Sequence, residues 1–300
     1  MARIMRKDAD KMEGSDLLIR LNRCYKSLSK GQKQLAAYIT ENYDRAAFIT
    51  ASKMGRIVGV SESTVVRFAY ALGYDGYPEL QKSLQELIRN KLTSVQRIQL
   101  TSDLQSNDVL KSVLKADVAN IRATIDSIDN DSFNAAVDIM LSAERIYVIG
   151  LRSAAPLAQF LTYYLGFVMD NVVLVTGALG DIYEDIFRIG ENDVCVGISF
   201  PRYSNRTIDA LEFAAGKGAK VIAITDSVSS PVAEKAEYAL IARSDMASFA
   251  DSLVAPLSLI NAIIVACSLK RKEEVSGILN QLESIWGSQR VYVTKENGRE

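Results

Sequence analysis

From residue 145 onward, short apolar runs alternate with longer segments of helical periodicity, and this rhythm restricts the possible folds more than any other feature. Five runs predict strands, at Arg145–Ile149, Val172–Val175, Asp193–Ser199, Lys220–Thr225 and Tyr238–Ile241. Helices are predicted between and after them, at Ala154–Met169, Tyr203–Lys217 and Ala247–Lys270. Strands that are apolar at nearly every position are typical of parallel sheets buried on both faces. The second half of the chain is therefore predicted to be a doubly wound α/β domain with a parallel sheet.

The first part of the chain, residues 1–92, lacks this alternation, and its pattern predicts an all-helical domain. Apolar side chains recur at helical spacing, and Ser29 with Gln32 forms a capping box at the start of one helix. Pro78 suits the first turn of another helix. Polar residues from Thr93 to Asn107 predict a linker, so we expect two domains in this chain of 300 residues.

The composition excludes several classes of function. The chain contains no histidine, which removes the commonest general base and the commonest metal ligand. Its three cysteines are too widely spaced for a zinc knuckle or a disulfide framework. There is no cofactor fingerprint and no nucleophile–base pair, so we expect no catalytic residue, no metal and no cofactor. The charged N-terminus does not look like a signal peptide, and no apolar run reaches the roughly 18 residues of a membrane span, so a cytoplasmic protein is expected.

Charge is divided unevenly between the two parts of the chain. Residues 1–97 contain 17 lysines and arginines against 10 acidic residues, whereas the remainder contains 18 against 26. A basic N-terminal part on an acidic body is the distribution expected when only the first part meets a polyanion. Chance segregation between two domains would give the same numbers.

The segment 51–72 predicts a helix-turn-helix. Gly59 lies between two short helices, Val60 supplies an apolar residue beneath the turn, and Ser61 is a good N-cap for the second helix. Short polar and cationic side chains at the start of that helix can enter a major groove, and basic residues on the first helix suit phosphate contacts. The residues predicted to contact DNA are Lys53, Arg56, Ser61, Ser63, Thr64, Arg67, Tyr74 and Tyr77. An ordinary helical hairpin with a solvated face is the alternative.

Two loops that follow predicted strands combine serines with arginines. Gly150–Ser153 and Ser199–Thr207 each lead from a strand into a helix, where free backbone amides favour a phosphate or carboxylate. The residues predicted to bind such an anion are Arg152, Ser153, Ser199, Arg202, Ser204, Arg206 and Thr207. Routine helix capping would explain the serines equally well, and the arginines could instead pair with Asp181 or Asp226.

These motifs carry a family resemblance. The segment Val58–Phe68 (Val-Gly-Val-Ser-Glu-Ser-Thr-Val-Val-Arg-Phe), followed by Ala71–Leu80 (Ala-Leu-Gly-Tyr-Asp-Gly-Tyr-Pro-Glu-Leu), resembles the first domain of the RpiR/MurR family of bacterial regulators. Residues from about Ile128 to Leu269 are similar to the sugar isomerase (SIS) domain that follows it in that family. The resemblance implies a transcription factor with a DNA-binding domain at 1–92, a linker at 93–107, a sensing SIS domain at 108–271 and a C-terminal helix and tail at 272–300.

The resemblance also implies partners. We expect double-stranded DNA with a roughly palindromic operator, a homodimer or tetramer formed through the SIS domain, and a small phosphorylated sugar or sugar acid as effector. Sugar-phosphate isomerases share the SIS domain, so an isomerase with a helical appendage is the alternative. In that case Glu184 and Asp185 are the nearest candidate bases.

The two ligand loops depart from the usual SIS pattern, in which the first loop is glycine-rich and the second reads Ser-x-Ser-Gly-x-Thr. The first loop has Leu151–Arg152 where a second glycine is common. In the second loop Ser199 matches the first serine, Ser204 falls at the threonine, and Pro201–Arg202 replaces the Ser-Gly pair. Ser153, Ser199 and Ser204 are therefore carried over as phosphate contacts, and the added arginines favour a more extended or more highly charged acid than a simple hexose phosphate.

Overall fold

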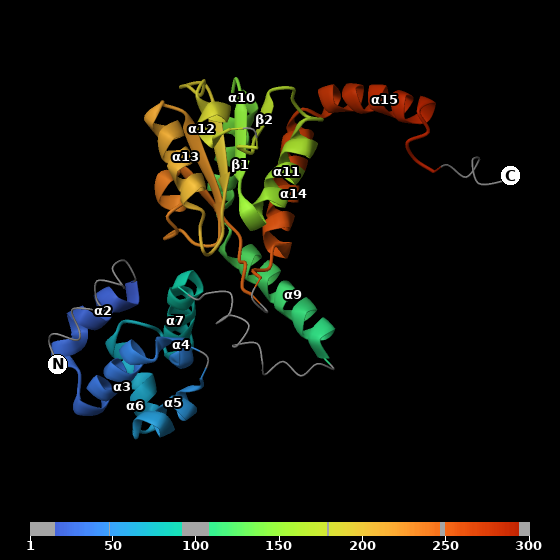
Figure 1. Ribbon diagram of the computed structural model, residues 1–300. Helices are drawn as coiled ribbons and strands as arrows, with labels where there is room; N and C mark the ends of the chain where they lie inside the picture. The colour runs from blue at the N-terminus through green and yellow to red at the C-terminus, as the bar shows by residue number, and fades with distance from the viewer. Residues whose placement is uncertain (1–15, 48, 92–107, 179, 247–249, 294–300) are drawn as a thin grey trace. The chain divides into compact units, whose positions relative to one another are not determined.

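The computed structural model of the protein describes residues 16–47, 49–91, 108–178, 180–246 and 250–293 (Figure 1). Contacts along the chain divide it into two compact units, Met1–Thr93 and Ser94–Glu300. The predicted linker at 93–107 lies outside the described residues.

The first unit is helical, as predicted. Its helices are α2 (Asp16–Cys24), α3 (Lys30–Glu41), α4 (Tyr43–Ala46), α5 (Ala51–Val58), α6 (Glu62–Ala71) and α7 (Tyr77–Lys91). The expected capping box begins α3, where Ser29 Oγ accepts from the Gln32 amide at 3.4 Å and Gln32 Oε1 accepts from the Ser29 amide at 2.9 Å. The core is apolar and includes Leu35, Phe68 and Leu80, each fully buried.

The turn between α5 and α6 confirms the predicted helix-turn-helix geometry. Gly59 ends α5 with φ +79°, a left-handed conformation that glycine adopts without steric cost. Ser61 caps α6 by accepting a hydrogen bond from the Thr64 amide at 3.2 Å. Gly55 lets the two helices approach closely, because a Cβ atom there would lie 2.7 Å from the carbonyl oxygen of Val60. This close approach was not predicted from the sequence.

The second unit contains the predicted parallel sheet. Its strands are β1 (Ile146–Gly150), β2 (Val172–Val175), β3 (Val194–Ile198), β4 (Lys220–Thr225) and β5 (Tyr238–Ile241). They lie in the order β2-β1-β3-β4-β5, and every neighbouring pair is parallel. The order changes direction between β1 and β3, and open α/β sheets bind ligands outside the carboxyl ends of the strands at such a point.

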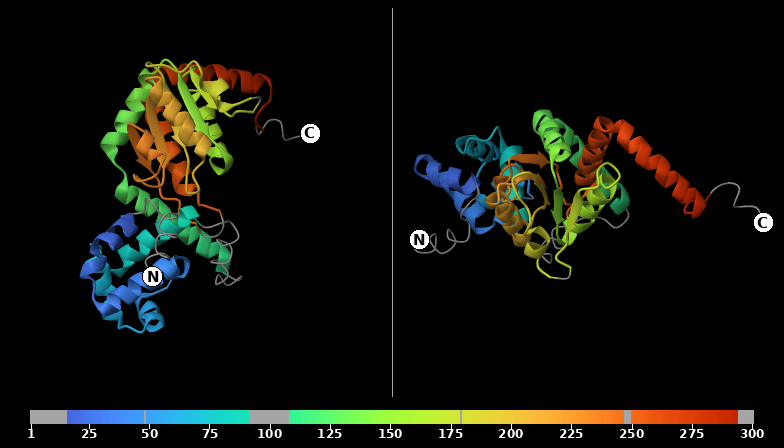
Figure 2. Two further views of the ribbon diagram at one scale, coloured as in Figure 1. Left: turned by 60° about the vertical axis from the view of Figure 1, so that its left-hand side comes forward. Right: turned by 90° about the horizontal axis from the view of Figure 1, so that it is seen from above.

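Helices cover both faces of this sheet (Figures 1 and 2). Alternate strand residues face opposite sides, so Val148 of β1 packs in one core cluster and Ile149 in the other. The first face carries α10 (Asn130–Ser142), α11 (Ala155–Leu165) and α14 (Val254–Lys270), and the second carries α12 (Ile182–Ile186) and α13 (Asn205–Gly216). The doubly wound architecture is confirmed.

Three helical segments differ from or add to the predictions. Helix α9 (Val109–Ser127) and α10, both before β1, had no predicted counterpart. The last sheet-covering helix begins at Val254 rather than at residue 247, and Pro256 lies in its first turn, where proline is tolerated. A further helix, α15 (Lys272–Ser288), agrees with the predicted C-terminal helix. Within the described ranges no single helix is long and apolar enough to cross a membrane, although the α14–α15 pair, bent by 101°, passes that test together by length and composition.

Candidate DNA interface and ligand cavity

The exposed face of α6 presents polar groups at helical spacing. Ser63, Arg67 and Tyr70 follow one another at three- and four-residue intervals, so they lie on the same side of the helix, and all three are exposed. The Arg67 guanidinium donates to the Ser63 carbonyl at 3.2 Å and to Ser63 Oγ at 3.3 Å. These short contacts hold the long arginine side chain along the helix, with its remaining N–H groups available to a partner.

The first turn of α6 forms a cluster of hydroxyls. Ser61 Oγ lies 2.9 Å from Ser63 Oγ and 2.8 Å from Thr64 Oγ1. Lys53 and Arg56 are exposed on the preceding helix. Six of the eight residues predicted to contact DNA therefore have exposed or half-exposed side chains on this helix pair.

Tyr74 and Tyr77 do not belong to that surface, which corrects the sequence prediction that they contact the DNA backbone. Their side chains are only 4% and 5% exposed. The Tyr74 hydroxyl hydrogen-bonds Ser83 Oγ at 2.9 Å, and the Tyr77 hydroxyl donates to the Ile49 carbonyl at 2.5 Å. Both tyrosines therefore hold the helical unit together, because their polar ends are used within it.

Two features of this surface were missed from the sequence. Tyr70 is 58% exposed, in contrast to the two buried tyrosines. It lies seven residues, or two helical turns, after Ser63, and this spacing could have placed it on the same exposed face. The start of α3 also approaches α6, since a Cβ on Gly31 would lie 3.5 Å from Thr64 Cγ2 and 3.2 Å from Val60 Cγ1. The exposed Lys30 at that helix start therefore lies close to the helix-turn-helix.

The burial of Tyr77 leads to a prediction about alkaline stability. Burial, with a smaller contribution from Tyr38, raises the pKa of Tyr77 to about 12 from its usual 10. The unfolded side chain loses its proton near pH 10 while the folded one keeps it, so the free energy of unfolding should fall as the pH rises from about 10 to about 12. Urea unfolding followed by circular dichroism at pH 9 and pH 11 should show a smaller pH-dependent loss in Tyr77→Phe than in the wild type. Equal losses in both proteins would contradict this account.

In the second unit the two predicted loops meet at the ends of adjacent strands. Gly150 and Ile198, the last residues of β1 and β3, are paired in register, so the loops that follow them begin side by side. Together they line a cavity of about 790 Å³. Six of the seven residues predicted to bind an anion line it, namely Arg152, Ser153, Ser199, Arg202, Ser204 and Arg206. The seventh, Thr207, is fully buried in the first turn of α13.

The serines of the second loop order its backbone. Ser199 Oγ accepts from the Ser204 amide at 3.1 Å, and Ser204 Oγ caps α13 by accepting from the Thr207 amide at 3.4 Å. The helix-capping alternative thus holds for Ser204, while its hydroxyl still lines the cavity. Among the described residues Thr207 Oγ1 has no hydrogen-bond partner. The start of α13 therefore places the Ser204 hydroxyl and the positive end of a helix dipole at the cavity.

The arginines differ in their surroundings. Arg206 forms an ion pair with Asp181, one of the two acids considered for it in the sequence. The hydrogen bond that Arg206 donates to the Asp181 carboxylate lowers the pKa of Asp181 and raises the pKa of Arg206. Arg152 and Arg202 both have left-handed backbone conformations, with φ +58° and +65°. These two residues stand where the sequence departs from the glycine-containing SIS loops.

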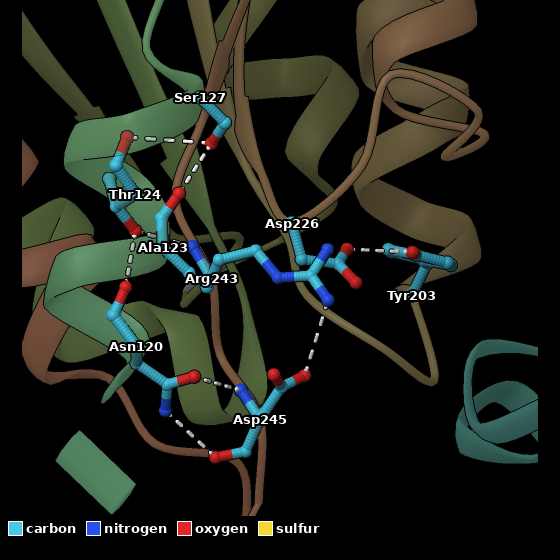
Figure 3. Close-up of polar contacts among 8 residues, drawn as sticks. All are labelled: Asn120, Ala123, Thr124, Ser127, Tyr203, Asp226, Arg243 and Asp245. Carbon is cyan, nitrogen blue, oxygen red and sulfur yellow. Dashed lines mark hydrogen bonds and ion pairs between the residues drawn. The ribbon is translucent and has the colours of Figure 1, made fainter. Parts of the chain in front are cut away.

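A polar network runs from the cavity toward α9 (Figure 3). The hydroxyl of Tyr203, which lines the cavity, donates to Asp226 at 2.7 Å. The Arg243 side chain extends toward the carboxyl groups of Asp226 and Asp245, and its guanidinium lies 3.7 Å from Asp245 Oδ1. Asp245 in turn exchanges two backbone hydrogen bonds with the Asn120 side chain of α9, at 2.9 and 3.1 Å.

A second contact joins α9 directly to the cavity wall. Ser252 Oγ donates to Asp117 of α9 at 2.6 Å, and its neighbours Asp251 and Leu253 line the cavity. The Arg243 amide also donates to Thr124 of α9 at 2.9 Å. Helix α9 is thus fixed to the segment that follows β5 at several points.

The acidic residues considered for an isomerase have structural partners. Glu184 completes a capping box with Asp181 at the start of α12. Asp185 accepts from the amides of Thr176 and Gly177 at 3.0 and 2.9 Å. In the part of the chain that the structure describes, no group of three or more potential metal ligands is found.

A helix-turn-helix unit attached to a parallel α/β domain with an anion-suited cavity defines a class of protein, the transcriptional regulators that carry a sensor domain. Comparison with known proteins agrees. Residues 15–91 match the helix-turn-helix domain of the rpiR family, and residues 139–266 match the SIS domain. The chain belongs to the RpiR family of transcriptional regulators, as the sequence resemblance predicted.

Individual regulators are similar to this chain over most of their length. An HTH-type transcriptional regulator of Haemophilus influenzae is 28% identical over 235 residues, which cover 76% of this chain and 80% of the relative. The regulator HexR of Escherichia coli is 27% identical over 223 residues, 71% of this chain and 73% of the relative. These relatives identify the protein as a DNA-binding regulator and not an enzyme, so the isomerase alternative is not favoured.

Two solved structures share the fold. The sugar isomerase domain of an RpiR transcription factor from Sphaerobacter thermophilus has a TM-score of 0.57 at 24% identity, covering 59% of this chain and 99% of that chain. NanR of Vibrio vulnificus, solved in complex with ManNAc-6P, has a TM-score of 0.55 at 22% identity, covering 90% of this chain and 97% of that chain.

Proposed function

We propose that this regulator binds a roughly palindromic DNA operator through α5 and α6, and that a phosphorylated sugar or sugar acid in the β1–β3 cavity controls the binding. The single observation that carries the proposal is the cavity itself. It lies where the strand order changes direction and is lined by serines, arginines and the start of a helix. Such a protein would work in the cytoplasm, where it meets its operator.

The chemistry of the cavity favours a phosphate group. Ser204 and the first-turn amides of α13 offer hydrogen-bond donors at the positive end of a helix, the arrangement that commonly binds phosphate. Arg206 adds a cation at the same loop. The ligand of NanR, a sugar phosphate bound by a protein with this fold, supports the same ligand class here.

We further propose that two copies associate through the apolar surface of α9 and α14. Exposed apolar side chains form a stripe along α9 at Leu110, Leu114, Val118 and Ile125. Helix α14 has no charged residue before Lys270 and exposes Val265 and Leu269. Between the helices lies an apolar groove of about 240 Å³. Exposed apolar side chains on two neighbouring helices are typical of a protein interface. A second copy of the chain fits here because the residues of the stripe and of the groove carry no charge.

A twofold dimer explains how a ligand bound in the SIS domain would change the affinity of the protein for DNA. Two recognition helices held by one dimer would enter successive major grooves, which requires a palindromic operator of fixed half-site spacing. Helix α9 carries the proposed interface, and Asp117 of α9 accepts a hydrogen bond from Ser252, which lies between the cavity-lining residues Asp251 and Leu253. If the segment that Ser252 belongs to has two conformations and the ligand binds one of them more tightly, ligand binding would shift the dimer toward the matching arrangement.

The test measures ligand binding and DNA binding in the same protein. A panel of phosphorylated sugars and sugar acids should contain compounds that raise the Tm and change operator affinity at fixed salt. In Ser153→Ala, which loses an exposed hydroxyl in the cavity, the Tm shift should shrink while operator affinity without ligand is unchanged.

The coupling is tested separately with Ser252→Ala. This variant breaks the hydrogen bond to Asp117 and leaves the lining of the cavity intact. It should keep the Tm shift but lose about half or more of the effect of ligand on operator affinity. If no compound in the panel changes either the Tm or operator affinity, the proposed sensing function is wrong.

A further inference from the structure

Two arginines at the cavity adopt a backbone conformation that normally belongs to glycine. Within the described residues, three non-glycine residues have positive φ, namely Arg152, Arg202 and Arg290. The first two line the cavity. A side chain with a Cβ atom is disfavoured in this region, and residues kept there tend to lie at functional sites.

The positions of these arginines suit a role in ligand binding. Arg152 is the second residue after β1 and Arg202 the fourth after β3, so the two loops present them from adjacent strands. Both side chains are exposed, and the Arg152 guanidinium has no hydrogen-bond or ion-pair partner among the described residues. Glycine would satisfy the local backbone without strain, so neither arginine is needed for the turn itself.

The third arginine of the cavity lies at the start of α13. Arg206 pairs with Asp181, and it lies in the first turn of α13 beside the hydroxyl of Ser204. A phosphate at the start of α13 would therefore find its hydrogen-bond donors in Ser204, Arg206 and the first-turn amides, without Arg152 or Arg202. Arg152 belongs to the other loop, and the cavity volume of about 790 Å³ leaves room for a ligand that reaches both loops.

We propose that Arg152 and Arg202 bind a second anionic group of the ligand, separate from the phosphate at α13, so that the cavity selects doubly anionic sugar derivatives over sugar monophosphates. This inference rests on the proposed sensing function and narrows its ligand class. The second group is a carboxylate or another phosphate, since a guanidinium recognises either through paired N–H···O hydrogen bonds.

Calorimetric titration of the full chain tests the inference with three probes, 6-phosphogluconate, fructose 1,6-bisphosphate and glucose 6-phosphate. The wild type should bind at least one of the two doubly anionic probes about tenfold or more tightly than the monophosphate. The first probe adds a carboxylate and the second a phosphate, so their ranking identifies the second group.

Arg152→Gly and Arg152→Ala form a matched pair of variants. Both should lose about 10- to 100-fold in affinity for the preferred probe, with a change of less than about threefold for glucose 6-phosphate. Arg152→Gly should have a Tm about 2–4 °C above that of Arg152→Ala, because only glycine relieves the left-handed backbone. Arg202→Gly should show the same selective loss.

Two results would overturn the inference, and they are distinguishable. If glucose 6-phosphate binds as tightly as both other probes, and Arg152→Gly weakens all three equally, the arginine serves the phosphate and the sensing function still stands. If none of the three probes nor any other phosphorylated sugar binds, the inference fails together with the proposed function.

Discussion

Replacing Arg67 by alanine should lower the affinity for the operator by on the order of 10²- to 10³-fold, the largest effect expected of any single exposed residue. Arg67 lies on the exposed face of α6, and within the described residues its hydrogen bonds go to Ser63, one turn earlier. A bidentate contact of arginine with guanine contributes roughly 1–3 kcal/mol, and a dimer would lose it in both half-sites. Fluorescence anisotropy with the operator, over a range of salt concentrations, measures the change.

Arg67→Lys separates two contributions to DNA affinity, the bidentate hydrogen bonds of arginine to a base and the attraction between its charge and the phosphates. Lysine keeps the positive charge, so binding to non-specific duplex and the dependence on salt should remain close to wild type. It lacks the planar fork of arginine, so preference for the operator should still fall. The Tm of both variants should stay near that of the wild type because the side chain is exposed. An unchanged operator affinity in Arg67→Ala would remove α6 from the proposed interface.

Features set by a few neighbouring residues were predictable from the sequence. The capping box of Ser29 with Gln32, the N-cap at Ser61 and the turn at Gly59 depend on local hydrogen bonds and backbone angles. Three of the five strands agree residue for residue with their apolar runs, and the other two differ only at their ends. Parallel pairing then brought the two predicted loops to one edge, where six of the predicted side chains line a single cavity.

Features that depend on distant packing were not predictable in this way. The burial of Tyr74 and Tyr77 depends on hydrogen-bond partners such as Ser83 and Ile49, which neighbouring residues in the sequence do not reveal. The burial of helix α9 could not be predicted from its spacing, because its apolar stripe is exposed while a polar residue, Asn120, is buried. That inverted pattern arises from tertiary hydrogen bonds, which a periodicity argument does not contain.

Leu114→Arg should convert the protein to a monomer and reduce operator affinity by about 10²-fold or more. Leu114 is 55% exposed in the middle of the apolar stripe of α9, and a buried arginine without a partner would oppose association strongly. A monomer binds one half-site at a time and loses the effective concentration that dimerisation gives its second recognition helix. Val265→Arg, on the 56% exposed face of α14, should have the same effect.

Ala119→Arg is the matched control, because it adds the same side chain to α9 on a different face, where Lys115 and Arg122 are already exposed. Sedimentation equilibrium should show a dimer for the wild type and Ala119→Arg and a monomer for Leu114→Arg. The Tm of the monomer should fall only as far as loss of association requires, and ligand affinity should remain, since neither residue lines the cavity. If Leu114→Arg and Val265→Arg remain dimers with full operator affinity, the second copy binds elsewhere and α9 does not carry the signal.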